Sequence, residues 1–261
     1  MRRLFLALLA IALVAACRPK GASRDAERCS YMEEALGLGM QMVWVEGGSF
    51  VMGATSEQAE EAYDDEHPPH GVTLDGYWMA ATEVTQAQWQ AVMGSNPAHF
   101  KGDAQRPVES ISWADAKLFC DRLSAQTGRR YALPTEAQWE YAARGGVKAA
   151  GCIYSGSNVA EDVAWYDENS DAATHAVAQR RPNELGLYDM CGNVMEWCAD
   201  WYDCYDAAAQ TSPAGPSEGA TRVVRGGCSG HFYRNCRVSS RDDFEPSYRN
   251  LYIGFRVVRL P

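Results

Sequence analysis

Thiol side chains lie close together near the C-terminus, directly after Arg225-Gly226-Gly227. Cys228 and Cys236 could both reach one metal ion, because thiolates are good ligands for soft metals such as Cu(I). A disulfide from either residue to Cys198 or Cys204 is the simpler interpretation. The chain has nine cysteines but no Cys-x-x-Cys pair, so their spacing indicates no zinc module.

Hard oxygen ligands are concentrated in the turn-rich segment from Tyr188 to Trp197. Asp189, Glu196 and several backbone carbonyls within eight residues would suit a calcium ion. The alternative is a turn whose carboxylates are solvated, in which Asn193 bonds local backbone. A hydrolase is not indicated, because no serine, histidine or aspartate lies in a recognisable nucleophile turn.

Three helices are predicted to position these segments. Each begins with a hydroxyl residue at the N-cap. Three residues later comes a side chain that can accept a hydrogen bond from the backbone N–H of the N-cap residue. The predicted N-caps are Thr85, Ser112 and Thr135. The first and third helices each carry a tryptophan, Trp89 and Trp139, which we interpret as core residues.

Strand patterns frame these helices in the sequence. Apolar alternation broken by glycine predicts strands at 43–52 and 72–79, and a strong pattern returns only at 222–225 and 254–259. Residues 145–220 are rich in Gly, Asn, Asp, Ser and Ala and predict mainly irregular backbone.

The N-terminal residues predict export. Arg2 and Arg3 precede an apolar run that is too short to span a bilayer, and residues 1–16 are therefore interpreted as a signal peptide. The sequence Val14-Ala15-Ala16-Cys17 resembles a bacterial lipobox, which predicts lipidation of Cys17 and an outer-membrane or cell-surface location. Residues 17–38 are predicted to form a tether and 39–261 a single domain. The net charge of −10 argues against a nucleic-acid partner.

Seven segments together resemble the formylglycine-generating-enzyme, or sulfatase-modifying-factor, family. In order they are MVWVEGGSFVMG, ATEVTQAQW, RPVESISWADAKLFC, YALPTEAQWEYAARGG, GLYDMCGNVMEWCADWY, RVVRGG and IGFRVVR. The resemblance implies an α+β, C-type-lectin-like fold of the sulfatase-modifying-factor type, with little regular secondary structure. It also implies a structural calcium ion bound by the side chains of Asp189 and Glu196 and by the carbonyls of Gly192 and Val194.

The copper site of the family's oxidases has no counterpart at its expected place. Those enzymes bind copper through two thiolates five residues apart, shortly after Arg-Gly-Gly, and a serine directly follows the glycines. Here Cys228 takes the serine position and the next cysteine is Cys236, so no pair has that separation. We therefore expect no copper and predict no catalytic residues.

The C-terminal segment resembles instead a shorter branch of the family, the variable proteins diversified by retroelements. In those proteins asparagine codons are rewritten at adenines, which never yields Lys, Gln, Met or Trp. None of these four occurs in 228–252, and only Glu245 lies outside the accessible set. The predicted ligand-binding residues of this variable region are Ser229, Gly230, His231, Phe232, Tyr233, Ser240, Asp242, Asp243, Phe244, Tyr248, Asn250, Leu251 and Tyr252.

Three functions remain open from the sequence. The favoured one is a surface lipoprotein that binds an unknown protein or cell-surface ligand through residues 228–252, where aromatic and small polar side chains are mixed as in antibody paratopes. The second is a metal-dependent oxidoreductase acting on protein cysteine. The third is a structural lipoprotein of the cell envelope, in which 228–252 is an ordinary divergent loop.

Overall fold

The computed structural model describes residues 30–261 apart from residue 59. The predicted signal peptide and Cys17 therefore lie outside the described residues. The last part of the predicted tether belongs to the folded domain, since β1 (Ser30–Glu33) pairs antiparallel with β2 (Met40–Val45). Leu38 between them is buried. The domain boundary predicted at residue 39 is thus too late, because the preceding residues supply an edge strand.

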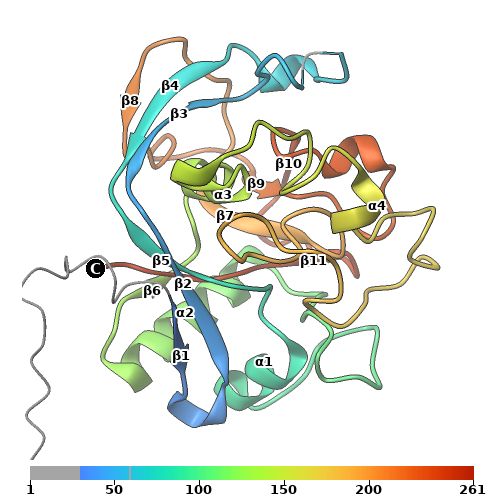
Figure 1. The fold of residues 1–261 in the computed structure, drawn as a ribbon. Coiled ribbons are helices and arrows are strands. Elements are labelled where there is room, and N and C mark those ends of the chain that lie inside the picture. Colours follow the sequence, from blue (N-terminus) through green and yellow to red (C-terminus); the bar gives the residue numbers. More distant parts are fainter. Residues whose placement is uncertain (1–29, 59) are drawn as a thin grey trace, which may run out of the picture.

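The strands of the described residues form three sheets (Figure 1). The five-stranded sheet has the order β1, β2, β5 (Tyr77–Ala80), β12 (Val258–Arg259), β6 (Tyr131–Ala132). The four-stranded sheet has the order β10 (Arg241–Phe244), β9 (Arg222–Arg225), β7 (Met195–Trp201), β11 (Ile253–Gly254). The three-stranded sheet has the order β3 (Gly48–Met52), β4 (His70–Leu74), β8 (Gln210–Thr211). Neighbours are antiparallel except the pairs β11–β7 and β4–β8.

Glycines divide each of the first two predicted strand runs. β2 and β3 follow one another across Gly47, as do β4 and β5 across Gly76, and these four strands make a long ribbon that joins two sheets (Figure 1). A Cβ on Gly47 would lie 2.8 Å from the backbone N of Gly76, and one on Gly76 would lie 2.4 Å from the Trp44 ring. Only glycine fits where the two runs cross so closely.

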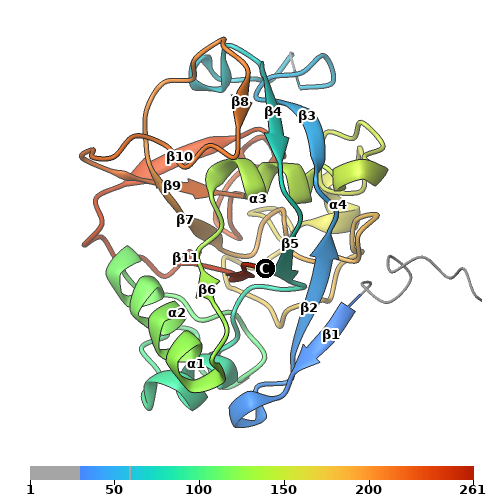
Figure 2. The ribbon, with the colours of Figure 1, turned by 90° about the vertical axis from the view of Figure 1, so that its left-hand side faces the viewer.

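The predicted helix caps are confirmed. Thr85, Ser112 and Thr135 each form a capping box, at the starts of α1 (Gln86–Met93), α2 (Trp113–Thr127) and α3 (Glu136–Ala143). Figure 2 shows α1 and α2 side by side at one end of the molecule, with α3 near the junction of the sheets. The shorter helical elements of the described residues are α4 (Ala160–Val163) and 3₁₀ turns at Ala35–Gly37, Asp64–Glu66, Gly146–Lys148 and Tyr233–Cys236.

Two apolar clusters form the core, one on each side of the five-stranded sheet's central strands. Trp139 belongs to the first and Trp89 to the second, which confirms their interpretation as core residues. Between α4 and β7 the described backbone is mainly turns, as predicted. The α+β class is therefore confirmed. In the part of the chain that the structure describes, no helix is long and apolar enough to cross a membrane.

Candidate ligand-binding face

Two glycines set the start of the predicted variable region. β9 ends at Arg225, and Gly226 and Gly227 follow at φ values of 94° and 67°. A Cβ on Gly226 would lie 3.1 Å from the Trp139 ring, and one on Gly227 would lie 2.7 Å from the carbonyl oxygen of Asn235. Both the left-handed conformation and the close approach require glycine. The pair therefore turns the chain out of the sheet at a defined point.

Buried ion pairs hold the rest of the C-terminal segment. Four buried arginines each bond a buried glutamate: Arg225 with Glu140, Arg237 with Glu66, Arg241 with Glu136, and Arg256 with Glu196. Arg241 donates from Nε and Nη2 to the two oxygens of Glu136, at 2.7 and 2.8 Å. Bidentate pairs of this kind fix both position and orientation. We call these four pairs the arginine frame.

Most of the predicted ligand-binding residues lie at the surface between members of this frame. Phe232 is 67% exposed, Tyr233 41% and Tyr248 39%. Gly230 and Asp242 are also exposed, and a further six are half-buried, namely His231, Asp243, Phe244, Asn250, Leu251 and Tyr252. The structure therefore brings eleven of the thirteen predicted residues to the surface of one chain segment.

Ser229 and Ser240 are the two exceptions. Both side chains are buried, and Ser240 directly precedes Arg241 of the arginine frame. Their place among the ligand-contacting residues is corrected, because backbone bonds hold both inside: the Ser229 carbonyl accepts from the Ser170 hydroxyl, and the Ser240 carbonyl accepts from Arg225. In the folded chain they support the surface loops from below.

The exposed aromatic side chains are held by neighbours rather than free. Phe244 and Tyr248 stack with ring centroids 4.7 Å apart, and Tyr233 meets the ring of Tyr166 edge-on at 6.4 Å. The hydroxyl of Tyr252 donates to the carbonyl oxygen of Ala172 at 3.0 Å. Contact with a partner would therefore cost these rings little conformational entropy.

Beside these rings lie buried polar atoms without hydrogen-bond partners in the described part of the chain. They are Asp167 Oδ1, Ser229 Oγ and His231 Nδ1. The backbone N–H of Asp167 donates to the carbonyl oxygen of His231 at 3.0 Å, which places these residues side by side. Burial lowers the pKa of His231, against the attraction of Asp242 and Asp167. A neutral imidazole with an open nitrogen can bond a polar group of a ligand.

The predicted calcium residues lie in a buried turn. Asp189 has φ 54°, and its Oδ2 accepts a hydrogen bond of 2.7 Å from the backbone N of Ala178. Asn193 donates to Glu83 at 2.9 Å and accepts from the backbone N of His175 at 2.9 Å. Asn193 therefore connects the turn to residues far away in the sequence, and not to local backbone as the sequence interpretation had it.

The donor set at this turn does not fit a calcium ion held jointly by both predicted carboxylates. The two oxygens of Glu196 accept from Nε and Nη2 of Arg256, each at 2.7 Å, and one also accepts from the Trp139 indole. Arg256 thus supplies the positive charge that a cation would bring to Glu196. No group of three or more His, Cys, Asp or Glu residues between 30 and 261, residue 59 excepted, is arranged to hold a metal.

The same turn nevertheless carries excess negative charge. Glu83, Asp189 and Glu196 are all buried, and Arg256 is the arginine that bonds within this group. Burial, followed by repulsion from Asp189 and Glu196, raises the pKa of Glu83 well above its usual range. Burial likewise raises the pKa of Asp189 to about 6. Calcium at Asp189, with the Gly192 and Val194 carbonyls, stays a prediction.

The cysteines of the C-terminal segment are buried free thiols. Cys198, Cys228 and Cys236 have no exposed surface, whereas Cys204 is exposed, and all four are free in the structure. The disulfides considered from the sequence are therefore not formed. Burial raises the pKa of Cys228 to about 12 and that of Cys236 well above its ordinary value. Thiols that stay protonated are poor copper ligands and poor nucleophiles.

Comparison with known proteins identifies the family. The sulfatase-modifying factor enzyme 1-like domain matches residues 30–261. The chain belongs to this family. It is 31% identical over 306 residues to the chaperone protein LppX of Paenibacillus barcinonensis, with 98% of each chain covered.

Solved structures of this family share the fold. The Treponema denticola variable protein 1 superposes with a TM-score of 0.81 and 31% identity, covering 89% of this chain and 98% of that one. PvdO from Pseudomonas aeruginosa superposes with a TM-score of 0.73 and 26% identity, covering 90% and 98%. The C-type-lectin-like fold of the sulfatase-modifying-factor type is therefore confirmed.

Sequence reasoning missed the residues that come to this face from elsewhere. Tyr166 and Asp167 contact the variable region from the loop after α4, and Phe100 lies 6.2 Å from the Tyr252 ring. Their own sequence neighbourhood is turn-rich and carries no signal of a binding role. Only the fold shows that they border residues 228–252.

Proposed function

We propose that this member of the sulfatase-modifying-factor family is an exported lipoprotein, anchored through Cys17 at the outer membrane or cell surface. Its exposed residues within 228–252 bind a protein or another cell-surface ligand. The observation that carries the proposal is the exposure of Phe232, Tyr233 and Tyr248 on loops held by the arginine frame. Clustered exposed aromatic rings mark binding surfaces, because water contact with apolar area is unfavourable.

The polar surroundings of these rings support recognition of a mixed surface. His231 Nδ1 and Asp167 Oδ1 are buried without partners in the described residues, so each would gain a hydrogen bond from a suitably placed ligand group. Asp242 and Asp243 add negative charge. A ligand with basic or hydrogen-bond-donating groups around an apolar patch matches this chemistry, whereas nucleic acid does not.

The likeness to the Treponema denticola variable protein 1 supports the finer proposal that residues 228–252 are diversified. The arginine frame gives that proposal a physical basis. It fixes the backbone through buried side chains beneath the exposed residues of 228–252, and the residues between can change without loss of core contacts.

Site-specific photocrosslinking tests the binding proposal. A benzophenone amino acid at position 232 or 248 of the full-length, membrane-displayed protein is expected to give discrete adducts that mass spectrometry can identify. The matched control is position 147, because Val147 is also an exposed apolar residue, at 59%, but lies outside residues 228–252. Equal adducts from position 147, or none from 232 and 248, would contradict the proposal.

Diversification and anchoring need separate tests. Sequencing the gene in many isolates should show substitutions confined to the surface codons of 228–252, beside a reverse-transcriptase gene and a template repeat. Changes spread evenly along the gene would indicate an ordinary divergent loop. Lipidation is tested by metabolic labelling with an alkyne fatty acid, and Cys17→Ser should abolish the label and release the protein from the membrane.

The calcium prediction is tested by thermal unfolding. If the Asp189 turn binds calcium, millimolar Ca²⁺ should raise Tm relative to excess chelator, and Asp189→Asn should remove the difference. The partial neutralisation of Glu196 by Arg256 leads us to expect a small effect, of the order of 1–3 °C. A Tm that does not depend on Ca²⁺ would rule out calcium at this turn.

A further inference from the structure

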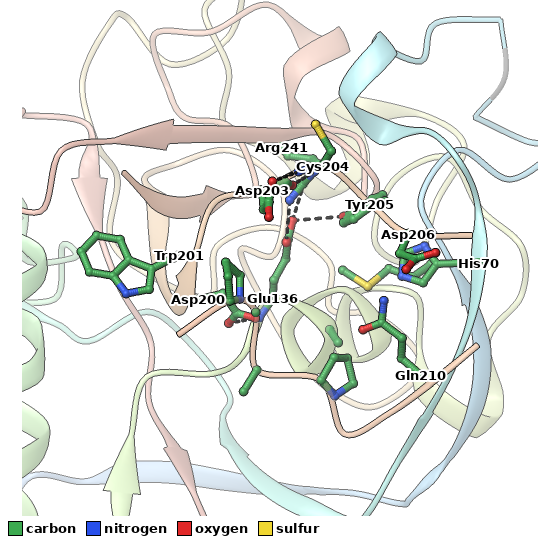
Figure 3. Close-up of a pocket in the computed structure, with 16 residues that line it drawn as sticks. His70, Glu136, Asp200, Trp201, Asp203, Cys204, Tyr205, Asp206, Gln210 and Arg241 are labelled. Carbon is green, nitrogen blue, oxygen red and sulfur yellow. Dashed lines mark hydrogen bonds and ion pairs between the residues drawn. The ribbon is translucent and has the colours of Figure 1, made fainter. Parts of the chain in front are cut away.

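A cavity of about 280 Å³ lies away from the aromatic side chains of the binding face. Its lining comes from the end of β7 and the residues that follow it, the loop 213–216 and the start of α3, together with Met52 of β3 and His70 of β4. Figure 3 shows Arg241 and Glu136 in this lining, and this pair belongs to the arginine frame. The volume is just below the range of about 300–1,000 Å³ that drug-sized ligands fill, so its occupant is small.

The cavity is lined by more negative than positive charge. Glu136 is matched by Arg241 and also accepts a hydrogen bond of 3.1 Å from the Tyr205 hydroxyl (Figure 3). Three further carboxylates line the cavity, those of Asp200, Asp203 and Asp206. None of these three forms an ion pair within the described residues, whose salt bridges involve other acids.

Asp200 is the deepest of these acids. Its side chain is only 5% exposed, and its Oδ2 accepts a hydrogen bond of 2.8 Å from the backbone N of Glu136, the first residue of α3. Burial, followed by repulsion from Glu136, raises the pKa of Asp200 to about 7. An asparagine would make the same hydrogen bond without the cost of a buried charge. A buried carboxyl group with a raised pKa beside a cavity is typical of ligand sites.

Other parts of the lining are apolar or aromatic. Met52, Ala137 and Pro213 contribute aliphatic surface, and the ring of His70 packs on Tyr205 with centroids 4.7 Å apart. A ligand that combines a positive end with a short apolar body would match both the acidic and the apolar residues of the lining. A metal ion would match only the acidic side, and the described residues hold no cluster of metal-binding groups here.

We infer that this cavity binds a primary amine on a short aliphatic chain, with its ammonium group at the carboxylate of Asp200 and its chain against Met52, Ala137 and Pro213, while Asp203 and Asp206 add negative charge elsewhere in the lining. The ammonium group supplies the positive charge that Asp200 lacks. Its hydrogen bonds to the carboxylate join two opposite charges, which those of a neutral isostere cannot do. The same chemistry is present in a free diamine and in the lysine side chain of a peptide. This site is separate from the aromatic binding face and does not depend on it.

Calorimetric titration of the full-length protein with cadaverine at pH 8 tests the inference. Asp200→Asn should weaken binding at least about tenfold, because a charge-assisted hydrogen bond is lost while the bond to Glu136 is retained. The matched control is Asp121→Asn, which removes one charge from an exposed carboxylate on α2, and it should leave the affinity unchanged. Thermal melting of both variants shows that each is folded.

Three further probes make the outcome decisive. 1-Pentanol, which keeps the aliphatic chain without the charge, should not bind. Nα-acetyl-lysine methylamide stands for the lysine side chain of a peptide, and cadaverine stands for a free diamine. Binding of either of these two amines supports the site. The inference is overturned if neither amine binds, if pentanol binds as well, if Ca²⁺ displaces the amine, or if Asp200→Asn has no effect. Crosslinking from position 232 is independent of all these results.

The pH dependence adds a readout that belongs to Asp200. Affinity should increase as pH rises through about 7, because the carboxylate becomes charged while the amine stays protonated. The charged or titratable groups around Asp200 are Glu136 on α3, Arg241 on β10, Arg222 on β9, Cys198 on β7, and His70 across the cavity. Asp200→Asn should remove this increase, whereas a contribution from His70 would persist in the variant.

Discussion

The frame arginines and the loops between them belong to the same segment of chain, but they differ in burial and in the contacts that they make. Frame arginines such as Arg237 are buried and bond glutamates far away in the sequence, whereas Phe232, five positions earlier, is 67% exposed. In the frame each arginine bonds a buried glutamate and further groups around it. In the loops the rings contact single neighbours, and part of each side chain faces solvent.

This contrast shows how a chain with little regular structure can hold a variable surface. Buried ion pairs add little net stability compared with apolar packing, but loss of one partner leaves an uncompensated buried charge. The frame therefore makes the backbone position depend on buried residues that are not part of the exposed loops. The exposed loops then carry the chemistry of recognition and contribute little to folding.

The largest effect is expected where the frame is broken. Glu66→Ala should destabilise the fold by about 3–5 kcal/mol, because the guanidinium of Arg237 would stay buried without its partner. Urea unfolding followed by circular dichroism measures the change. The double variant Glu66→Met with Arg237→Met should recover a large part of the loss, since it removes both charges. A loss below about 1 kcal/mol in the single variant would contradict the role of the frame.

Asp200 is a buried charge without such a pair, and its removal should stabilise the protein. The pKa of about 7 in the fold is higher than the ordinary value near 4, so the folded state binds the proton more tightly. Wild-type stability should then fall as pH rises from about 4 to 7, and the fall should be smaller in Asp200→Asn, where the other buried carboxyls with raised pKa values, Asp189 and Glu83, still contribute. We expect the variant to melt roughly 3–10 °C higher at pH 8 and at nearly the same temperature at pH 4.

Gly227 lies in the turn between Arg225 of the frame and the first exposed loop, and its substitution tests whether the tight geometry of that turn matters. Gly227→Ala combines a positive φ with a Cβ 2.7 Å from the carbonyl oxygen of Asn235, and should cost about 1–3 kcal/mol. Gly102→Ala is the matched control, since Gly102 has φ 107° but open space around its Cβ. It should cost less, about 1 kcal/mol. Equal costs in chemical denaturation would show that the close contact at Gly227 is unimportant.

Local features of the fold could be predicted from the sequence because their causes lie within a few residues. The capping boxes at Thr85, Ser112 and Thr135 need only a hydroxyl and a side chain three positions later. The breaks at Gly47 and Gly76 follow from the missing Cβ. The exposure of the aromatic loop residues was expected because of the resemblance to variable proteins.

Long-range partnerships could not be predicted. Glu66 and Arg237 are 171 residues apart, and the pairing of Arg256 with Glu196, which alters the predicted calcium site, spans 60. The edge strand β1 has no sequence signal of its own, because its partner β2 is visible only in the sheet. The burial of Ser229 and Ser240 likewise depends on partners outside their immediate sequence, Ser170 and Arg225.

Substitutions of the exposed aromatic residues should have the smallest effect on stability and the largest effect on binding. Phe232→Ser together with Tyr248→Ser should change the free energy of unfolding by less than about 1 kcal/mol for each residue, because Phe232 is 67% exposed and Tyr248, at 39%, stacks on the partly buried Phe244 ring. The same variant should lose most of the binding to whatever partner is captured by photocrosslinking from position 233, since exposed aromatic residues dominate interface energies. Val147→Ser changes an exposed apolar residue elsewhere and should affect neither quantity. If the double variant instead unfolds readily and still binds, the rings belong to the core of the domain, and the separation between frame and surface is wrong.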